Sequence, residues 1–181
     1  LYMYLGGAYE HLNDLEKAYG TLQEGIKVDE FNKEQFLKAG KLALKLKDPE
    51  AAERNMREAL AVDPGYLEAA LTLAKFFLAE ERYSDCKDII EYTKESGESD
   101  PQFDWLLAQA LHGMEEYEEA KHYYAEASKE YNDSEEFLRE YGFFLLEEGD
   151  RTKAGEIFNR LLERSPWNEE YISVIESIQG E

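Results

Sequence analysis

Hydrophobic residues recur along the chain with the spacing of amphipathic helices. Tyr117, Ala120, Tyr124 and Ala127, for example, occupy positions that share one face of a helix. Short polar segments rich in Asp, Pro and Gly, such as residues 63–65, separate these stretches and mark turns. The sequence contains no run of alternating polar and apolar residues bounded by turn signals, as β-strands would require. The pattern predicts an all-α protein.

The pattern repeats every 34 residues, in phase and without an insertion, across five units. Two of the aligned series hold small residues, and two hold mostly bulky ones. Because helices approach to about 8–10 Å when the contact residues are small, the small series predict where the two helices of each unit cross. The small series are Gly6, Gly40, Ala74, Ala108, Gly142 and Ala18, Ala52, Cys86, Ala120, Ala154; the bulky series are Tyr9, Ala43, Phe77, Leu111, Leu145 and Leu22, Met56, Ile90, Tyr124, Phe158.

A 34-residue helix-turn-helix unit with these series resembles the tetratricopeptide repeat (TPR) family. The family pattern is matched in the fifth unit by Leu138, Tyr141-Gly142, Leu145, Ala154, Phe158 and Pro166. The resemblance implies a right-handed α-solenoid of five repeats, at residues 1–32, 33–66, 67–100, 101–134 and 135–168. Residues 169–179 are then expected to form a capping helix with one apolar and one polar side. The chain as a whole also resembles the C-terminal half of a longer bacterial protein of this family.

The two ends of the chain carry different expectations. Residue 1 is Leu inside a segment already patterned as helix, so we expect the N-terminal part of the parent protein to lie upstream. Without a preceding repeat, Tyr2 and Leu5 would expose an apolar end through which the chain could self-associate.

At a helix start further along, Asp133 and Glu136 have the spacing of a capping box.

Composition narrows the class of function. The 41 Asp and Glu residues against 20 Lys and Arg give a net charge of −21, which argues against nucleic acid as a partner. With 13 Tyr, 9 Phe and 2 Trp, the chain is too aromatic to be disordered. No apolar run is long enough for membrane insertion. The single cysteine, Cys86, fits a reducing compartment, so we expect a cytoplasmic protein.

The sequence lacks particular residues that known catalytic and metal-binding motifs require. Gly40-Lys41 is not part of a phosphate-binding loop. That motif requires Gly at its first position and Ser or Thr after the Lys, and these positions hold Gln35 and Leu42. The three histidines lack metal-ligand spacing with one another, and Cys86, in an alanine series, reads as a small buried side chain. We therefore expect no enzymatic activity, no cofactor and no metal.

The TPR resemblance implies a concave groove lined by the first helix of each repeat. In this acidic chain, four lysines collect on that face in the second and third repeats, where they could jointly attract a carboxylate. An apolar strip runs beside them, with Trp105 as an anchor. The candidate peptide-binding residues are Leu37, Lys38, Lys41, Leu44, Lys45, Leu71, Lys75, Leu78, Trp105, Gln109, His112 and Phe143.

These features favour a non-catalytic scaffold that binds a peptide segment of a partner protein in the groove. The alternatives are a receptor for a short signalling peptide, which predicts a deep enclosed pocket, the regulatory arm of a larger enzyme, and a structural spacer. Trp105 and the lysines also have a plainer interpretation, as packing and solvated side chains. Chaperone binding is not expected, because Met3 and Gly7 replace the Lys and Asn of chaperone-binding TPR proteins.

Overall fold

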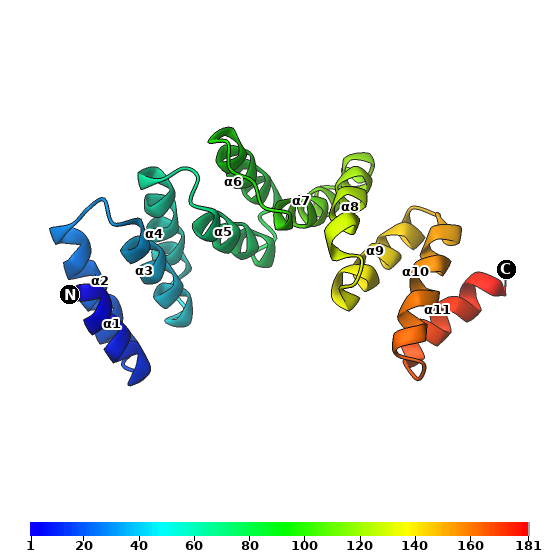
Figure 1. Ribbon diagram of the computed structural model, residues 1–181, viewed down its shortest axis with the longest axis horizontal. Coiled ribbons are helices and arrows are strands. Elements are labelled where there is room, and N and C mark those ends of the chain that lie inside the picture. The colour runs from blue at the N-terminus through cyan, green and yellow to red at the C-terminus, as the bar shows by residue number, and fades with distance from the viewer. Residues whose placement is uncertain (181) are drawn as a thin grey trace.

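The computed structural model describes residues 1–180, which form helices and no strands (Figure 1). The prediction of an all-α fold is confirmed. The helices are α1 (Tyr2–His11), α2 (Leu15–Val28), α3 (Lys33–Lys45), α4 (Pro49–Val62), α5 (Leu67–Ala79), α6 (Tyr83–Glu95), α7 (Gln102–Gly113), α8 (Tyr117–Tyr131), α9 (Glu135–Glu147), α10 (Arg151–Arg164) and α11 (Glu169–Gln179).

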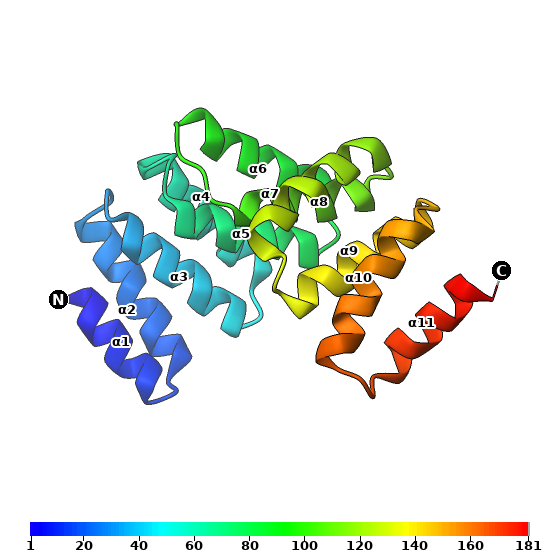
Figure 2. The ribbon, with the colours of Figure 1, turned by 45° about the vertical axis from the view of Figure 1, so that its right-hand side comes forward.

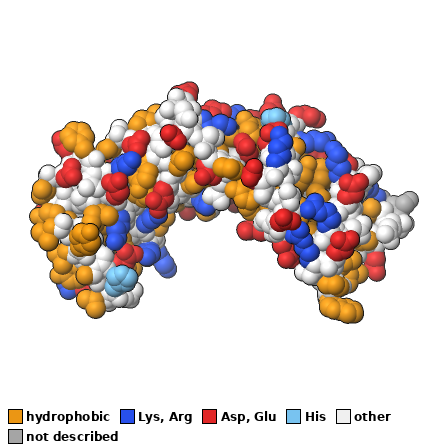
Figure 3. Space-filling model, viewed as in Figure 1, with side chains coloured by type: hydrophobic (Ala, Val, Ile, Leu, Met, Phe, Trp, Pro, Cys, Tyr) orange, Lys and Arg blue, Asp and Glu red, His pale blue; other side chains and the backbone are white. Residues whose placement is uncertain are grey.

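Consecutive helices form hairpins that stack in series from α1 to α11. The chain ends lie at opposite ends of the molecule in both ribbon views (Figures 1 and 2). The whole is an arch whose lower side is hollowed in Figure 3. This is an α-solenoid, as the repeat pattern predicts. We call α1, α3, α5, α7 and α9 the first helices, and the surface that they share the first-helix face. The exact repeat boundaries stay a prediction.

Small residues set the crossing of the two helices in each hairpin. A Cβ atom added at Gly40 would lie 2.8 Å from Met56 Cγ and 3.2 Å from the carbonyl oxygen of Ala52. At Gly142 it would lie 2.7 Å from Phe158 Cε2. Both distances are shorter than side chains tolerate without movement, so the helices are in contact at these positions. The two small series therefore mark the crossing, as the sequence predicts.

The turn inside each hairpin has one backbone conformation, which also recurs every 34 residues. The residue two after the end of each first helix has positive φ, and the next N–H donates to a carbonyl five residues earlier, for example Asp48 to Ala43 at 2.9 Å. Such a left-handed residue ends a helix and satisfies its last carbonyls. The five positions, with φ between 57° and 78°, are Asn13, Lys47, Glu81, Glu115 and Gly149.

Side-chain caps begin many of the helices. Asp48 accepts a hydrogen bond from Ala51 N at 2.9 Å, with Pro49 in the first turn of α4. The expected capping box at Asp133 is wrong. Ser134 caps α9 by accepting from Phe137 N, whereas Asp133 accepts from the Arg164 guanidinium at 2.7 Å. Ser134 sits one residue closer to the helix, where its backbone is extended as a cap requires.

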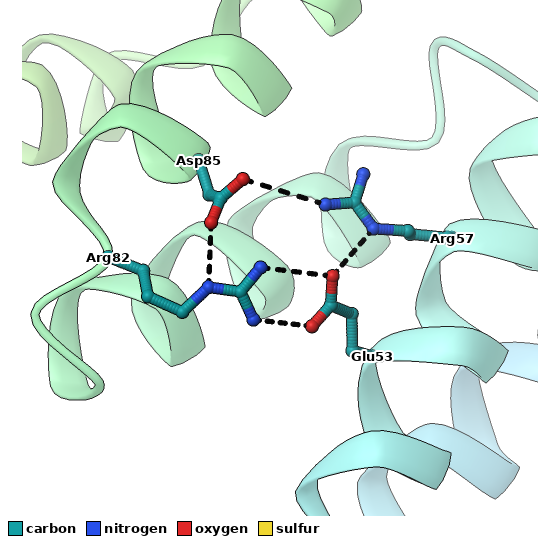
Figure 4. A network of polar contacts seen from close by, with 4 residues as sticks. All are labelled: Glu53, Arg57, Arg82 and Asp85. Atoms are coloured by element: carbon teal, nitrogen blue, oxygen red, sulfur yellow. Dashed lines mark hydrogen bonds and ion pairs between the residues drawn. The ribbon is translucent and has the colours of Figure 1, made fainter.

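A polar network ties the second helices α4 and α6 together (Figure 4). Arg82 occupies the position of the Asp48 cap one repeat later, and its guanidinium donates to Glu53 at 2.5 Å and to Asp85 at 2.6 Å. Arg57 donates to the same Glu53 carboxylate at 2.8 Å. Both guanidinium groups lie over the Phe77 ring. The hydrogen bond from Arg82 lowers the pKa of Glu53 from its usual range.

The terminal helices differ in what covers them. Tyr171 on α11 is buried and donates its hydroxyl to Glu135 at 2.9 Å, so α11 covers the end of the array. Glu176 takes the place of Gly142 in the 34-residue register and is exposed. On α1, Leu1 is 90% exposed and Leu5 43%, whereas Ala39, one repeat after Leu5, is fully buried. Self-association through this apolar end of α1 stays a prediction.

Replacing Glu115 by Gly is expected to stabilise the protein. Glycine adopts positive φ without the steric cost that a side chain incurs, so the free energy of unfolding should rise by about 0.5–1 kcal/mol. Thermal or urea unfolding monitored by circular dichroism measures the change. Gly149→Ala, at the equivalent turn, is the matched reverse variant and should destabilise. A loss of stability in Glu115→Gly would contradict the assigned turn conformation.

Replacing Glu53 by Gln is expected to cost about 1 kcal/mol of stability at pH 7, since it weakens the pairs with two arginines. The folded-state pKa of Glu53 lies below its ordinary value of 4.5. The stabilisation that the Glu53 carboxylate provides is therefore complete above pH 4.5 and is lost as the pH falls through its folded-state pKa.

Unfolding measured from pH 7 to pH 3 should show wild type and Glu53→Gln converging in acid. Glu58→Gln is the matched control, because Glu58 is exposed on the same helix and forms no ion pair among residues 1–180. A Glu53→Gln difference that stays constant across this pH range would rule out the carboxylate as its source.

Candidate functional site

Ion pairs join the first helices at the N-terminal end of the array. Between α1 and α3, the Glu10 carboxylate accepts a hydrogen bond from Lys45 Nζ at 2.6 Å and pairs with Lys38 at 3.5 Å. The Lys45 hydrogen bond is the main cause of the lowered pKa of Glu10. Between α3 and α5, Lys41 Nζ donates to Glu68 at 2.5 Å. Three of the four lysines expected to act jointly on a ligand carboxylate already pair with carboxylates of the chain, and their joint action on a ligand stays a prediction.

Glu140 on α9 accepts several hydrogen bonds at the junction of α7 and α9. Glu140 accepts hydrogen bonds from Trp105 Nε1 at 3.1 Å, from Gln109 Nε2 at 2.7 Å and from the Tyr124 hydroxyl at 2.7 Å. The Trp105 ring also packs edge-on against Phe137, with ring centroids 5.4 Å apart. Burial, and then the Glu140 charge, raise the pKa of Tyr124. Trp105 is thus held in place by the chain itself and is only partly exposed.

A second contact bridges α7 and α9, and a further one bridges α9 and α11. His112 Nε2 on α7 lies 2.8 Å from Glu147 Oε2 on α9. Arg139 on α9 donates to both oxygens of Glu170 on α11, at 2.7 and 2.6 Å, and its guanidinium lies over the Phe143 ring. Both residues were predicted to bind peptide. His112 is engaged in a contact between repeats, and Phe143 packs within its own repeat, against Arg139 and Phe158.

The junction of α5 and α7 lacks such a bridge. Among the residues that the structure describes, no side-chain hydrogen bond or ion pair links these two helices, and the exposed Lys75 on α5 has no partner. Lys75 lies on the boundary of two hollows. One, of about 690 Å³, is formed by the end of α3, the start of α4 and α5; the other, of about 290 Å³, is formed by α5, α7 and α9.

Each of the two hollows beside Lys75 has apolar side chains of its own in its lining. The larger is lined by Leu44, Leu71 and Phe76, and the smaller by Leu78, Leu106 and Trp105. A third hollow of about 400 Å³, between α1, α3 and α5, contains the paired lysines of the N-terminal junctions. Its floor is formed in part by Leu37, which is only 3% exposed and belongs to the core.

The structure thus gathers ten of the twelve candidate residues around three neighbouring hollows on the first-helix face and leaves His112 and Phe143 outside them. The sequence reasoning missed the acidic partners and part of the apolar lining. Glu68 could have been suspected, because Glu34 on α3 and Glu136 on α9 hold the same position of the 34-residue register. The missed residues include Glu10, Glu68, Glu140, Tyr66, Phe76, Gln102 and Leu106.

Two observations on the described residues concern metal binding and thiol reactivity. Within residues 1–180, no group of three or more His, Cys, Asp or Glu side chains is arranged to hold a metal ion. Cys86 is fully buried, and burial raises the pKa of its thiol to about 12, which suppresses the reactive thiolate. None of the described helices is long and apolar enough to cross a bilayer.

The sequence matches two tetratricopeptide models. The model of YpiA-like C-terminal tetratricopeptide repeats matches residues 101–168, and a general tetratricopeptide repeat model matches residues 43–110. The chain is 42% identical over all of its 181 residues to the TPR repeat-containing protein YpiA of Bacillus subtilis (strain 168), and it spans 43% of that protein's length. The expected correspondence with the C-terminal half of a longer bacterial TPR protein is confirmed.

Solved structures show the same fold at lower sequence identity. MamA 41-end from Desulfovibrio magneticus RS-1 is 19% identical with a TM-score of 0.79, covering 93% of this chain and 96% of that one. YrrB, described as a TPR protein with an unusual peptide-binding site, is 18% identical with a TM-score of 0.74, covering 88% and 82%. From its in-phase repeats, its solenoid fold and these matches, the chain belongs to the tetratricopeptide repeat family.

Proposed function

We propose that this array is a non-catalytic protein–protein interaction scaffold that binds a peptide segment of a partner along the first-helix face, across α3, α5 and α7. One observation carries the proposal. Lys75 is the unpaired lysine of the four predicted in the groove, and it lies between two apolar hollows. A cation flanked by apolar surface offers both an orienting contact and buried area, which peptide recognition requires.

The comparisons support this proposal at the level of family and fold. TPR arrays are typically non-catalytic interaction modules, and YrrB is described as having a peptide-binding site. The strongly acidic composition disfavours nucleic acid as the partner, because phosphate contacts need clustered basic side chains.

The shape of the hollows favours an extended segment over a short enclosed signalling peptide. A receptor for a small signalling peptide predicts a deep, closed pocket. The hollows beside Lys75 instead open along one continuous face formed by successive first helices. An extended chain can follow such a surface and place alternate side chains in successive hollows.

Substituting Lys75 by Glu is expected to abolish partner capture, because the groove would then repel a carboxylate and lose its orienting cation. The measurement is affinity capture from a lysate of the producing organism, with quantitative mass spectrometry. A protein retained by wild type should be depleted at least about tenfold by the variant. Lys75 is a cleaner probe than Lys41 or Trp105, whose substitution would also break contacts with Glu68 or Glu140.

Lys27→Glu is the matched control. It makes the same change of charge at an exposed position near the end of α2, outside the three hollows. It also removes an exposed ion pair with Glu24 on the same helix, which contributes little to stability. Both variants should retain the wild-type melting temperature. Equal capture by wild type and Lys75→Glu would move binding away from this face and contradict the proposal.

A further inference from the structure

We infer that the bound segment carries one acidic side chain that pairs with Lys75, with a large apolar side chain on the α3 side and a smaller one on the α7 side. This inference rests on the proposed function and names the chemistry of the partner at the same site. It follows from the α5–α7 junction. Among the described residues, this is the one junction between neighbouring first helices that no side-chain hydrogen bond or ion pair bridges.

The 34-residue register shows what is missing at that interruption. Lys41 on α3 pairs with Glu68 on α5. One repeat later, the equivalent positions are Lys75 on α5 and residue 102 on α7, which is Gln102. The lysine is kept and its carboxylate is replaced by a neutral amide. Lys75 and Gln102 both line the smaller hollow, so a carboxylate from a partner can take the place that Glu68 occupies one repeat earlier.

The charges facing Lys75 are consistent with one acidic residue rather than an acidic run. Glu68 and Glu80 line the larger hollow and Glu136 lines the smaller one, but Glu68 is already paired with Lys41. None of the three lies within ion-pair distance of Lys75. The chain carries a net charge of −21, so each further carboxylate in a partner would meet repulsion that is screened only beyond about 8 Å.

The unequal hollows assign the larger apolar side chain to one side of Lys75. The hollow on the α3 side has a volume of about 690 Å³ and the one on the α7 side about 290 Å³. In an extended chain, residues two positions before and after a central residue lie on the same face as that residue. A Phe and a Leu at these positions, with Glu between them, therefore match the larger hollow, Lys75 and the smaller hollow in turn.

The test uses nine-residue peptides with blocked ends and the central sequence Phe-Ala-Glu-Ala-Leu, and a second set with the reverse order of Phe and Leu. The Glu in each is also replaced by Gln. Dissociation constants are measured by isothermal titration calorimetry. At least one Glu peptide should bind about tenfold more tightly than its Gln counterpart. With Lys75→Gln, the Glu and Gln peptides should bind equally.

The decisive variant is Gln102→Glu. It restores the carboxylate that the register lacks, so Lys75 should pair within the chain and the preference for the Glu peptide should disappear. Its position in the first turn of α7 suits an acidic side chain, so the variant should fold with an undiminished melting temperature. Gln102→Ala is the matched control and should keep the preference, because it supplies no competing charge.

The possible failures separate this inference from the proposed function. Equal binding of Glu and Gln peptides to wild type, with both lost in Leu71→Asp, would overturn the acidic contact and leave peptide binding on this face intact. No measurable binding of any of these peptides would also overturn the inferred chemistry. The Lys75→Glu capture experiment then decides the proposed function by itself.

Discussion

The close crossing of two helices at small residues is the constraint on which the rest of this molecule depends. Where Gly40 meets Met56 and the backbone of Ala52, even one methyl group would not fit without movement. Because the same contact recurs every 34 residues, each hairpin has nearly the same shape, and stacking equal units produces a regular solenoid. The first helices then form one continuous face, and equivalent side chains on that face lie at regular intervals.

Because the repeats are regular, a junction that departs from the common pattern is easy to recognise. Lysines and carboxylates on successive first helices pair at the α1–α3 and α3–α5 junctions, and Glu140 joins α7 to α9 through neutral donors. Such exposed or half-exposed pairs each contribute little to stability. Their consequence for function is that they occupy Lys38, Lys41 and Lys45 on this face. The α5–α7 junction keeps a lysine without its carboxylate, and the two hollows meet there.

The fold was predictable from the sequence because its determinants repeat. Helical spacing, the 34-residue period and the small residues at Gly40 and Ala52 each act locally, so the sequence shows them directly. The turn conformation was not predictable, since Asn13, Lys47, Glu81 and Glu115 share positive φ without sharing a residue type. Only Gly149 and Asn13 carry residue types that such a turn favours.

The candidate site was predictable in location and not in detail. The register places the lysines on one face, but their partners come from other first helices, about 30 residues away in sequence. Whether Lys41 reaches Glu68, or Trp105 reaches Glu140, depends on the rotation between stacked hairpins. That rotation is a tertiary property that no single repeat encodes, so the sequence could not distinguish the paired lysines from Lys75.

The central claim is that pairing between first helices leaves Lys75 as the unpaired lysine among Lys38, Lys41, Lys45 and Lys75. Acetylation rates of individual lysines, measured by mass spectrometry under limiting reagent, test it most directly. The account predicts that Lys75 reacts faster than Lys41 and Lys45, and that Glu68→Gln accelerates Lys41 without changing Lys75. Equal rates at Lys41 and Lys75 in the wild type, with no effect of Glu68→Gln, would contradict it.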